Sequence, residues 1–158
     1  MPEPRSVLFV CMGNICRSPA GEGVMQHLVN DRGLSDRIVV DSAGTHGYHV
    51  GERADSRMRA AAKQRGYELL SRSRRVTRND LEEFDLIIAM DRDNMSGILQ
   101  LHTEPSAEIK MLSDYLDGDW PEDVPDPYYG GDAGFEQVMD MIETACPKII
   151  DALVGHQN

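Results

Sequence analysis

The sequence has few cysteines, no long apolar run and a shortage of positive charge. Three cysteines among 158 residues are too few to hold a secreted domain together with disulfides. No apolar run approaches the roughly 20 residues of a membrane-spanning helix, so we expect no stable membrane association. The 16 Lys and Arg residues and 27 Asp and Glu residues give a formal net charge of −11, which argues against a nucleic-acid partner.

The length and composition predict one domain, spanning residues 1–158, with a core of its own. A hydrophobic content of 41% is ordinary for a globular protein. Arg5 precedes only four apolar residues before Cys11, which is not the pattern of a signal peptide. Three cysteines cannot all pair, and a reactive thiol needs reducing surroundings, so we expect the protein to be cytoplasmic.

The positive charge that is present gathers between residues 53 and 78, which hold nine of the Lys and Arg residues. A run of this kind is usually a solvated helix face and loop. The alternative is a rim that attracts acidic phosphopeptides.

The stretch over residues 7–19 organises the chain. Four apolar residues, 7–10, predict a short buried strand, and Gly13 and Asn14 then suit a tight loop with positive φ angles. Ser18 is predicted to be the N-cap of a helix and Pro19 its first helical residue. A loop that enters a helix in this way points backbone N–H groups at an anion.

Two side chains add chemistry to this predicted anion site. Cys11 opens the loop and Arg17 closes it. A thiol beside an anion nest and an arginine ionises readily, and a thiolate is a nucleophile. The arginine fork matches two oxygens of a phosphate. The pattern indicates phosphoryl transfer through a phosphocysteine, although a bare Cys-x5-Arg is also met where the cysteine is only a small buried residue.

The remaining chain alternates helices and strands. Further strands are predicted over residues 38–40, 86–90 and 109–112, and helices over residues 19–30, 56–65, 77–84, 91–101 and 135–153. Residues 41–45 are predicted to form a polar turn, and Pro147 is expected to kink or divide the last helix. The alternation predicts an α/β fold, a single doubly wound domain with a parallel sheet flanked by helices and the phosphate-binding loop after the first strand.

A long acidic loop over residues 113–134 is predicted to supply the proton for a leaving group, because long loops in compact domains are usually functional. Spacing alone does not choose among its candidates, which are Asp117, Asp119, Glu122, Asp123 and Asp126.

The sequence resembles a known family over essentially its whole length. Residues 11–19, Cys-Met-Gly-Asn-Ile-Cys-Arg-Ser-Pro, are similar to the signature of the low-molecular-weight protein tyrosine phosphatases. The resemblance continues at residues 41–44, 90–91 and 126–130, in the family's order and spacing. It implies a four-stranded sheet and hydrolysis of phosphotyrosine in proteins, with no cofactor and no metal. Partners would be tyrosine-phosphorylated proteins, and the chain would be a monomer or weak dimer.

The resemblance also implies roles for particular residues. Cys11 would be the nucleophile, Arg17 would bind the phosphoryl group and Asp126 would be the general acid and base. Cys16 would trap oxidised Cys11 as a disulfide, unless it is only a packing residue. Ser42 would support the phosphate-binding loop, whose other members are Met12, Gly13, Asn14, Ile15, Cys16 and Ser18. The substrate cleft would be lined by Tyr48, Tyr128 and Tyr129.

Two positions depart from other members. Tyr48 stands where some members carry tryptophan, so its stacking on the substrate would be weaker or the substrate preference of the protein different. Ser71 stands where some members carry histidine, which puts part of the network that supports the loop in question.

Four other functions are weighed against this one. A zinc module could use Cys11, Cys16, His46 and His49, but the Cys-x4-Cys spacing is loose and an arginine would repel the cation. A catalytically inert phosphotyrosine-binding module would not need the nucleophile, arginine and acid together. An arsenate reductase of the same fold relays oxidation through mid-chain cysteines, and none lies between residues 16 and 146. A protein arginine phosphatase would carry threonine in place of Ile15.

Overall fold

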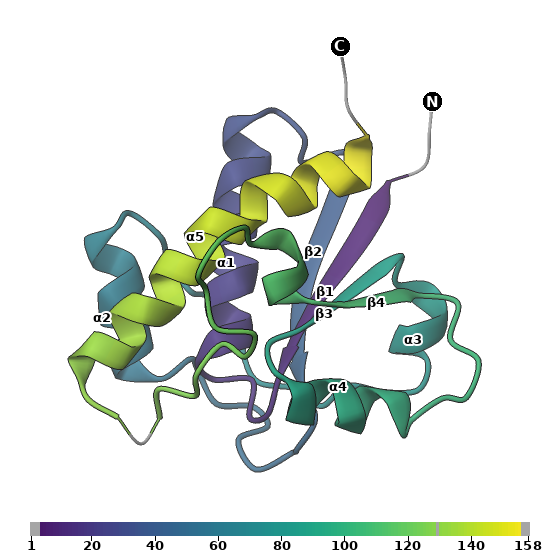
Figure 1. The fold of residues 1–158 in the computed structure, drawn as a ribbon, viewed down its shortest axis with the longest axis horizontal. Coiled ribbons are helices and arrows are strands. Elements are labelled where there is room, and N and C mark those ends of the chain that lie inside the picture. The colour runs from purple at the N-terminus through teal and green to yellow at the C-terminus, as the bar shows by residue number, and fades with distance from the viewer. Residues whose placement is uncertain (1–3, 129, 156–158) are drawn as a thin grey trace.

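Four parallel strands form the centre of the molecule in the order β2-β1-β3-β4 (Figure 1). They are β1 (Arg5–Cys11), β2 (Ile38–Gly44), β3 (Leu86–Ala89) and β4 (Glu108–Met111). The computed structural model describes residues 4–128 and 130–155. Because all pairings are parallel, the carboxyl ends of the strands meet at one edge, where Cys11 lies opposite Gly44. The predicted four-stranded α/β fold is confirmed.

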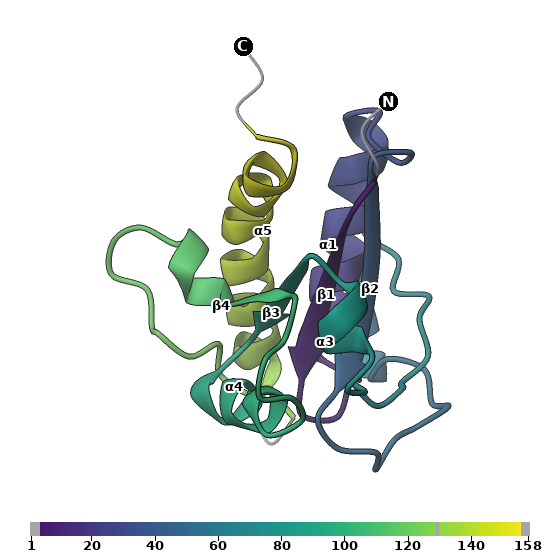
Figure 2. The ribbon, with the colours of Figure 1, turned by 90° about the vertical axis from the view of Figure 1, so that its right-hand side faces the viewer.

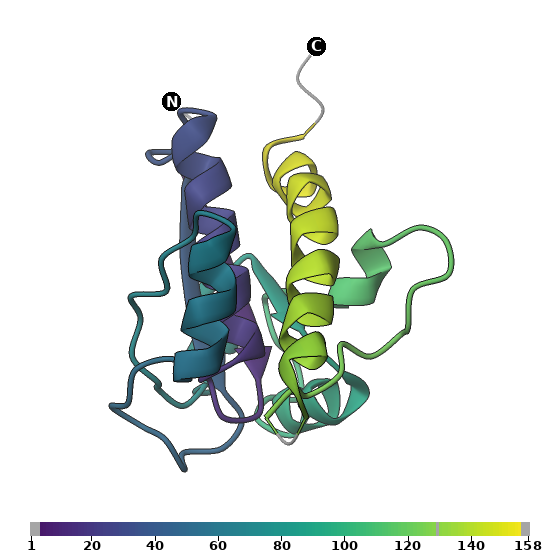
Figure 3. The ribbon, with the colours of Figure 1, turned by 90° about the vertical axis from the view of Figure 1, so that its left-hand side faces the viewer.

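Helices cover both faces of this sheet. Figure 3 looks onto the face with α1 (Arg17–Asp31), α2 (Ser56–Gln64) and α5 (Asp132–Val154). Figure 2 looks from the opposite side, where α3 (Asp80–Glu83) and α4 (Arg92–Leu99) lie in front of the strands. A short 3-10 helix, η1 (Leu112–Tyr115), follows β4. In the described part of the chain no helix is long and apolar enough to cross a membrane.

The side chains of β1 divide between two cores because strand residues alternate in direction. Val7 and Phe9 join the core beneath α1 and α5. Leu8 and Val10 join the second core, beneath α3 and α4. All four are fully buried, which is the expected state of a central parallel strand covered on both faces. This burial holds the end of β1, and so Cys11, in a rigid frame.

The second strand is longer and less buried than the sequence predicts. Residues 41–44 were expected to turn, but they continue β2 and pair with β1 as far as Cys11. The strand lies at the edge of the sheet, and Val39 is 51% exposed. Local turn propensity is overridden here because the backbone of β1 offers hydrogen bonds along the full length.

The predicted N-cap of α1 is also wrong. The helix begins at Arg17 with Cys16 as its cap, and the Ala20 N–H donates to the Cys16 carbonyl at 3.2 Å. Ser18 is therefore inside the first turn, where its hydroxyl serves Cys11 instead. Pro19 remains acceptable there, because an N–H in the first turn has no helical partner.

The other helix ends show mixed agreement with the sequence. Met58, Ala61 and Ala62 form the buried face of α2, as the pattern predicts. The helix predicted over residues 77–84 is shorter, α3 over Asp80–Glu83, and Thr77 and Asp80 exchange side-chain to backbone hydrogen bonds at its start. Helix α5 begins three residues earlier than expected, and Pro147 does not divide it. Packing of both turns around Pro147 against the core outweighs the lost backbone bond.

Candidate active site

The carbonyl groups of the loop between β1 and α1 accept hydrogen bonds from segments outside the loop. The N–H groups of Thr45 and His46 donate to the carbonyls of Cys11 and Met12, both at 2.9 Å. The Asp55 N–H donates to the Ile15 carbonyl at 2.7 Å, and a serine hydroxyl, that of residue 73, donates to the Gly13 carbonyl at 2.9 Å. Because the carbonyls are engaged outward, the loop presents N–H groups to its inner side, as an anion-binding nest requires.

Asn14 sets the turn of this loop. Its φ of 56° is the one positive φ at a non-glycine residue within residues 4–128 and 130–155. The side chain donates from Nδ2 to the hydroxyls of Ser18 (2.8 Å) and Ser42 (3.0 Å). Its Oδ1 accepts from the Arg74 N–H at 3.0 Å. The left-handed conformation is therefore maintained by three hydrogen bonds at a residue that is 1% exposed.

Gly44 lets the end of β2 approach the loop. A Cβ atom at this position would lie 2.8 Å from the Met12 carbonyl oxygen, closer than real Cβ atoms come. Any other residue would push the strand and the loop apart. The resemblance placed a glycine here, and the close backbone contact is its physical reason.

The Cys11 sulfur makes two hydrogen-bonding contacts with Ser18. Sγ lies 3.0 Å from Ser18 Oγ, and the Ser18 N–H donates to Sγ at 3.4 Å. Ser18 Oγ accepts from Asn14, and its one hydroxyl proton has two acceptors within reach, the sulfur at 3.0 Å and the Ala43 carbonyl at 3.4 Å. Both contacts stabilise a thiolate.

Arg17 lies beside this sulfur and is almost completely buried. Its Nη1 donates to Asp91 Oδ2 at 2.5 Å and to the Val124 carbonyl at 3.0 Å. Its Nη2 lies 3.6 Å from Asp126 Oδ2. Burial alone would lower the pKa of Arg17, but the charges of Cys11 and the two aspartates outweigh burial and raise it. The guanidinium is thus a permanent positive charge in the site.

Asp91 is a functional residue whose role sequence reasoning missed. It caps α4 by accepting the Asn94 N–H at 2.7 Å with one oxygen and orients Arg17 with the other. The available signal was its position directly after the carboxyl end of β3, at the sheet edge where Cys11 lies.

Among the five acids considered for proton transfer, the structure separates Asp126 from its neighbours. Asp126 lines the pocket that contains Cys11 and accepts the Tyr128 N–H at 3.0 Å. Asp123 instead pairs with Arg92 at 3.1 Å, and Asp117 pairs with Lys148. Asp119 and Glu122 do not line the pocket in the described part of the chain.

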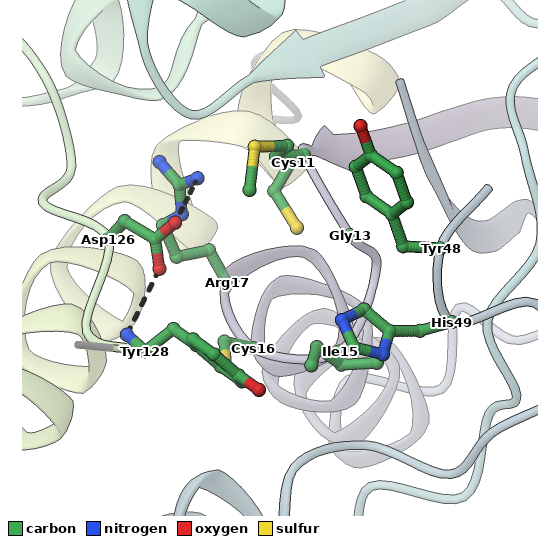
Figure 4. A pocket seen from close by; sticks show the side chains of 10 residues that line it. Cys11, Gly13, Ile15, Cys16, Arg17, Tyr48, His49, Asp126 and Tyr128 are labelled. Carbon is green, nitrogen blue, oxygen red and sulfur yellow. Dashed lines mark hydrogen bonds and ion pairs between the residues drawn. The ribbon is translucent and has the colours of Figure 1, made fainter. Parts of the chain in front are cut away.

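The pocket itself is a cavity of about 260 Å³ with Cys11 at its base (Figure 4). In the figure, Arg17, Asp126 and Tyr128 stand on one side, and Tyr48 and His49 on the other. The remaining lining residues come from the loop: Met12, Gly13, Ile15 and Cys16. The fold thus brings together the predicted loop, acid and two tyrosines, while Tyr129 lies outside the described residues.

Residues 48–49 form the pocket wall opposite Asp126. The resemblance predicted a place in this wall for Tyr48 and not for His49. Tyr48 is 75% exposed and stacks on His46, with ring centroids 5.3 Å apart. His49 was considered only as a zinc ligand, yet its Nδ1 lies 2.8 Å from Glu52 and its ring faces Gly13. Within the described residues, no three His, Cys, Asp or Glu side chains are grouped to hold a metal ion.

The other two cysteines are buried. Cys16 lies in the pocket wall, where burial, followed by the charges of Asp55 and Cys11, raises the pKa of its thiol. It is therefore a neutral thiol at neutral pH. Cys146 is buried in α5, and burial raises the pKa of its thiol as well.

A second layer of hydrogen bonds supports the loop through Ser42. Its hydroxyl donates to Glu22 Oε1 at 2.5 Å while accepting from Asn14. Burial raises the pKa of the Glu22 carboxyl and Asp41 adds to the effect, against hydrogen bonds from Ser42 and Ser71. The serine at position 71 thus keeps a contact to this network.

A thiol at the base of an anion-binding loop, with a buried arginine beside it at the carboxyl edge of a parallel sheet, defines the class of cysteine-dependent phosphatases. The chain matches the family model described as "Low molecular weight phosphotyrosine protein phosphatase" over residues 6–158, and it belongs to that family. Family membership makes it a hydrolase of phosphoproteins.

Individual relatives agree with this assignment. A Synechocystis protein named among the low molecular weight protein-tyrosine-phosphatases is 48% identical over 93% of this chain and 95% of its own. The crystal structure of an Entamoeba histolytica protein tyrosine phosphatase is 44% identical, with a TM-score of 0.90 over 96% of this chain and 98% of its own. A Drosophila arginine phosphatase is 32% identical, with a TM-score of 0.87 over 96% and 99% of the two chains.

The raised pKa of Glu22 predicts a pH dependence of stability. The folded protein keeps a proton on Glu22 in the range where the unfolded chain has released it, so this residue's contribution to stability falls as pH rises. Glu22→Gln stays neutral and keeps an oxygen that accepts from Ser42. We expect its unfolding free energy, relative to wild type, to increase from about pH 4 to about pH 7.5 in urea titrations.

The matched control is Glu104→Gln, which removes one exposed negative charge elsewhere. Parallel pH profiles for wild type and Glu22→Gln would contradict a raised pKa at the half-buried Glu22.

Proposed function

We propose that residues 1–158 act as one phosphatase domain that hydrolyses phosphotyrosine in proteins, with Cys11 as nucleophile, Arg17 as phosphoryl binder and Asp126 as general acid and base. One observation carries the proposal: Cys11, Arg17 and Asp126 line the same small pocket, where the Arg17 guanidinium lies 3.6 Å from the Asp126 carboxylate (Figure 4). We also propose that the protein is cytoplasmic, a monomer or weak dimer, and takes tyrosine-phosphorylated proteins as its partners.

In the first step the Cys11 thiolate attacks phosphorus in line. The P–O bond to the tyrosine ring breaks, and the phenolic oxygen takes a proton from Asp126. The three other phosphoryl oxygens are bound by the guanidinium of Arg17 and by the N–H groups of the loop. The product is a phosphocysteine, with Asp126 now ionised.

In the second step a water molecule replaces the departed phenol. The Asp126 carboxylate takes a proton from this water, the oxygen attacks phosphorus, and the P–S bond breaks. Inorganic phosphate leaves and the thiolate is restored, assisted by the hydroxyl of Ser18. Asn14 and Ser42 maintain the loop throughout.

The walls of the pocket account for the proposed preference for an aromatic substrate. Ile15 presents a branched apolar side chain, and Tyr128 and Tyr48 stand on opposite sides, where a flat ring enters between them. We include Tyr129 in this cleft from the resemblance alone. The phosphotyrosine side chain is long enough to bring its phosphate to a thiolate at the base of the pocket. The shorter side chains of phosphoserine and phosphothreonine do not reach this thiolate.

Cys16 has a proposed protective role that rests on its place in the same pocket wall as Cys11. When peroxide oxidises Cys11 to a sulfenic acid, the Cys16 thiol displaces hydroxide, which leaves as water, and a disulfide forms. A cellular thiol then reduces the disulfide.

Replacing the nucleophile tests the phosphocysteine mechanism. We expect Cys11→Ser to abolish turnover and to retain phosphate binding, because the loop and Arg17 remain while a hydroxyl is too poor a nucleophile. Steady-state hydrolysis of an aryl phosphate measures turnover, and direct titration of the protein with inorganic phosphate in a calorimeter measures binding. Cys16→Ser, in the same loop, is the control and should keep its turnover; measurable turnover by Cys11→Ser would overturn the mechanism.

Replacing the acid tests the choice among the loop carboxylates. Asp126→Asn should lower kcat/KM for aryl phosphates by roughly 10²–10⁴-fold, the usual contribution of a positioned acid. Asp123→Asn is the control, since this side chain is engaged with Arg92 outside the pocket. A larger loss in Asp123→Asn than in Asp126→Asn would show that the acid was assigned wrongly.

A second candidate function is hydrolysis of phosphoarginine, since a relative with the same fold is named as an arginine phosphatase. Ile15 argues for tyrosine, because a polar guanidinium against an apolar wall is left without hydrogen bonds. We expect kcat/KM for a phosphotyrosine peptide to exceed that for phosphoarginine, and Ile15→Thr to narrow the difference. A wild type that prefers phosphoarginine would replace the tyrosine assignment and leave the phosphocysteine mechanism intact.

A further inference from the structure

Arg57, in the first turn of α2, lies between the two segments that carry the reaction. Its Nη2 donates to the Tyr128 carbonyl in the acidic loop at 3.1 Å. The same guanidinium pairs with Asp55 through two contacts, Nε to Oδ1 at 3.2 Å and Nη2 to Oδ2 at 3.0 Å. Arg57 does not line the pocket and does not contact the reacting groups.

The guanidinium also lies over two aromatic rings. Its Cζ lies 5.5 Å from the ring centre of Tyr128 and 4.9 Å from that of Phe135, both within cation–π range. Phe135 is fully buried in the first turns of α5, which follows the acidic loop. The planar fork of arginine is thus seated against both the loop and the helix after it.

Each end of this bridge connects directly to the site. On one side, the Asp55 N–H donates to the Ile15 carbonyl of the phosphate-binding loop at 2.7 Å. On the other side, the Tyr128 N–H donates to Asp126 Oδ1 at 3.0 Å. A continuous series of contacts therefore runs from the nucleophile's loop through Asp55 and Arg57 to the carboxylate of Asp126.

We propose that Arg57 is a positioning residue that sets the place of Asp126 over the phosphate-binding loop, an inference that rests on the proposed role of Asp126 as the acid. Residues 116–128, the described part of the chain around Asp126, form no helix or strand, so no regular backbone ladder fixes the acid. Arg57 and Phe135 supply a fixed reference in its place. A misplacement of about 1 Å is enough to cost roughly 10²-fold in rate.

The ion pair between Arg57 and Asp55 does not account for the role of Arg57. The Arg57 side chain is 42% exposed, and exposed ion pairs contribute little to stability. Loss of Arg57 should therefore leave the fold intact and act on proton transfer to the leaving group. A purely structural role would instead lower activity equally for all substrates.

The experiment measures kcat/KM of Arg57→Ala and Arg57→Met with aryl phosphates whose phenols differ in pKa, from 4-nitrophenyl phosphate to phenyl phosphate. Methionine keeps apolar contact with both rings, so that one variant preserves packing. We expect both variants to lose about 10- to 100-fold with phenyl phosphate and much less with 4-nitrophenyl phosphate, because a better leaving group needs less help from the acid. Inhibition by inorganic phosphate should stay unchanged. Arg59→Ala is the matched control, since its Nε donates only to the Ala54 carbonyl among the described contacts.

A double-mutant cycle separates this inference from the proposed function. Adding Arg57→Ala to Asp126→Asn should cause no further loss, because the residue to be positioned is already inactive. If Asp126→Asn alone keeps full activity, the proposed acid is wrong. If Asp126→Asn is impaired but Arg57→Ala is fully active, or loses activity equally with every leaving group, or adds its whole loss to the double variant, Arg57 has no positioning role.

Discussion

The conformation of the phosphate-binding loop depends on Asn14. A left-handed non-glycine residue costs free energy, and here the cost is offset by hydrogen bonds to three separate parts of the chain. One bond reaches Ser18 and so supports the sulfur of Cys11, and another reaches Ser42 on β2. The third accepts a backbone N–H at Arg74. The loop is therefore set by the packed fold around it as well as by its own sequence.

Two aspartates, Asp91 and Asp126, form ion pairs with the Arg17 guanidinium and balance its charge. Asp91 makes the short contact, is more buried and also caps α4, so it orients the guanidinium. The Asp126 side chain stands at a longer distance and is 31% exposed, which suits its proposed exchange of a proton with substrate and water. A chain with a net charge of −11 thus concentrates one unexposed positive charge where phosphate must bind.

Sequence patterns predicted best where local and tertiary preferences coincide. The apolar run of β1 and the amphipathic face of α2 were found because their burial follows directly from periodicity. The end of β2 and the cap of α1 were misjudged, since Ser42 and Ser18 have turn and cap propensities that other contacts override. The contacts of Asp91 with Arg17 and of Arg57 with the Tyr128 carbonyl were not predicted, because the partners lie 74 and 71 residues away in the chain.

The sequence by itself determined the chemistry, since Cys11, Arg17 and the loop between them lie within seven residues and need only a strand before and a helix after. The tertiary structure decided which carboxylate faces that chemistry. Spacing left Asp117, Asp123 and Asp126 equivalent as residues of one acidic loop, and only the resemblance singled out Asp126. The fold supplies the physical difference, because it gives the first two basic partners elsewhere and turns the third toward Arg17. Contacts between distant segments select among equivalent side chains, and a linear pattern does not contain them.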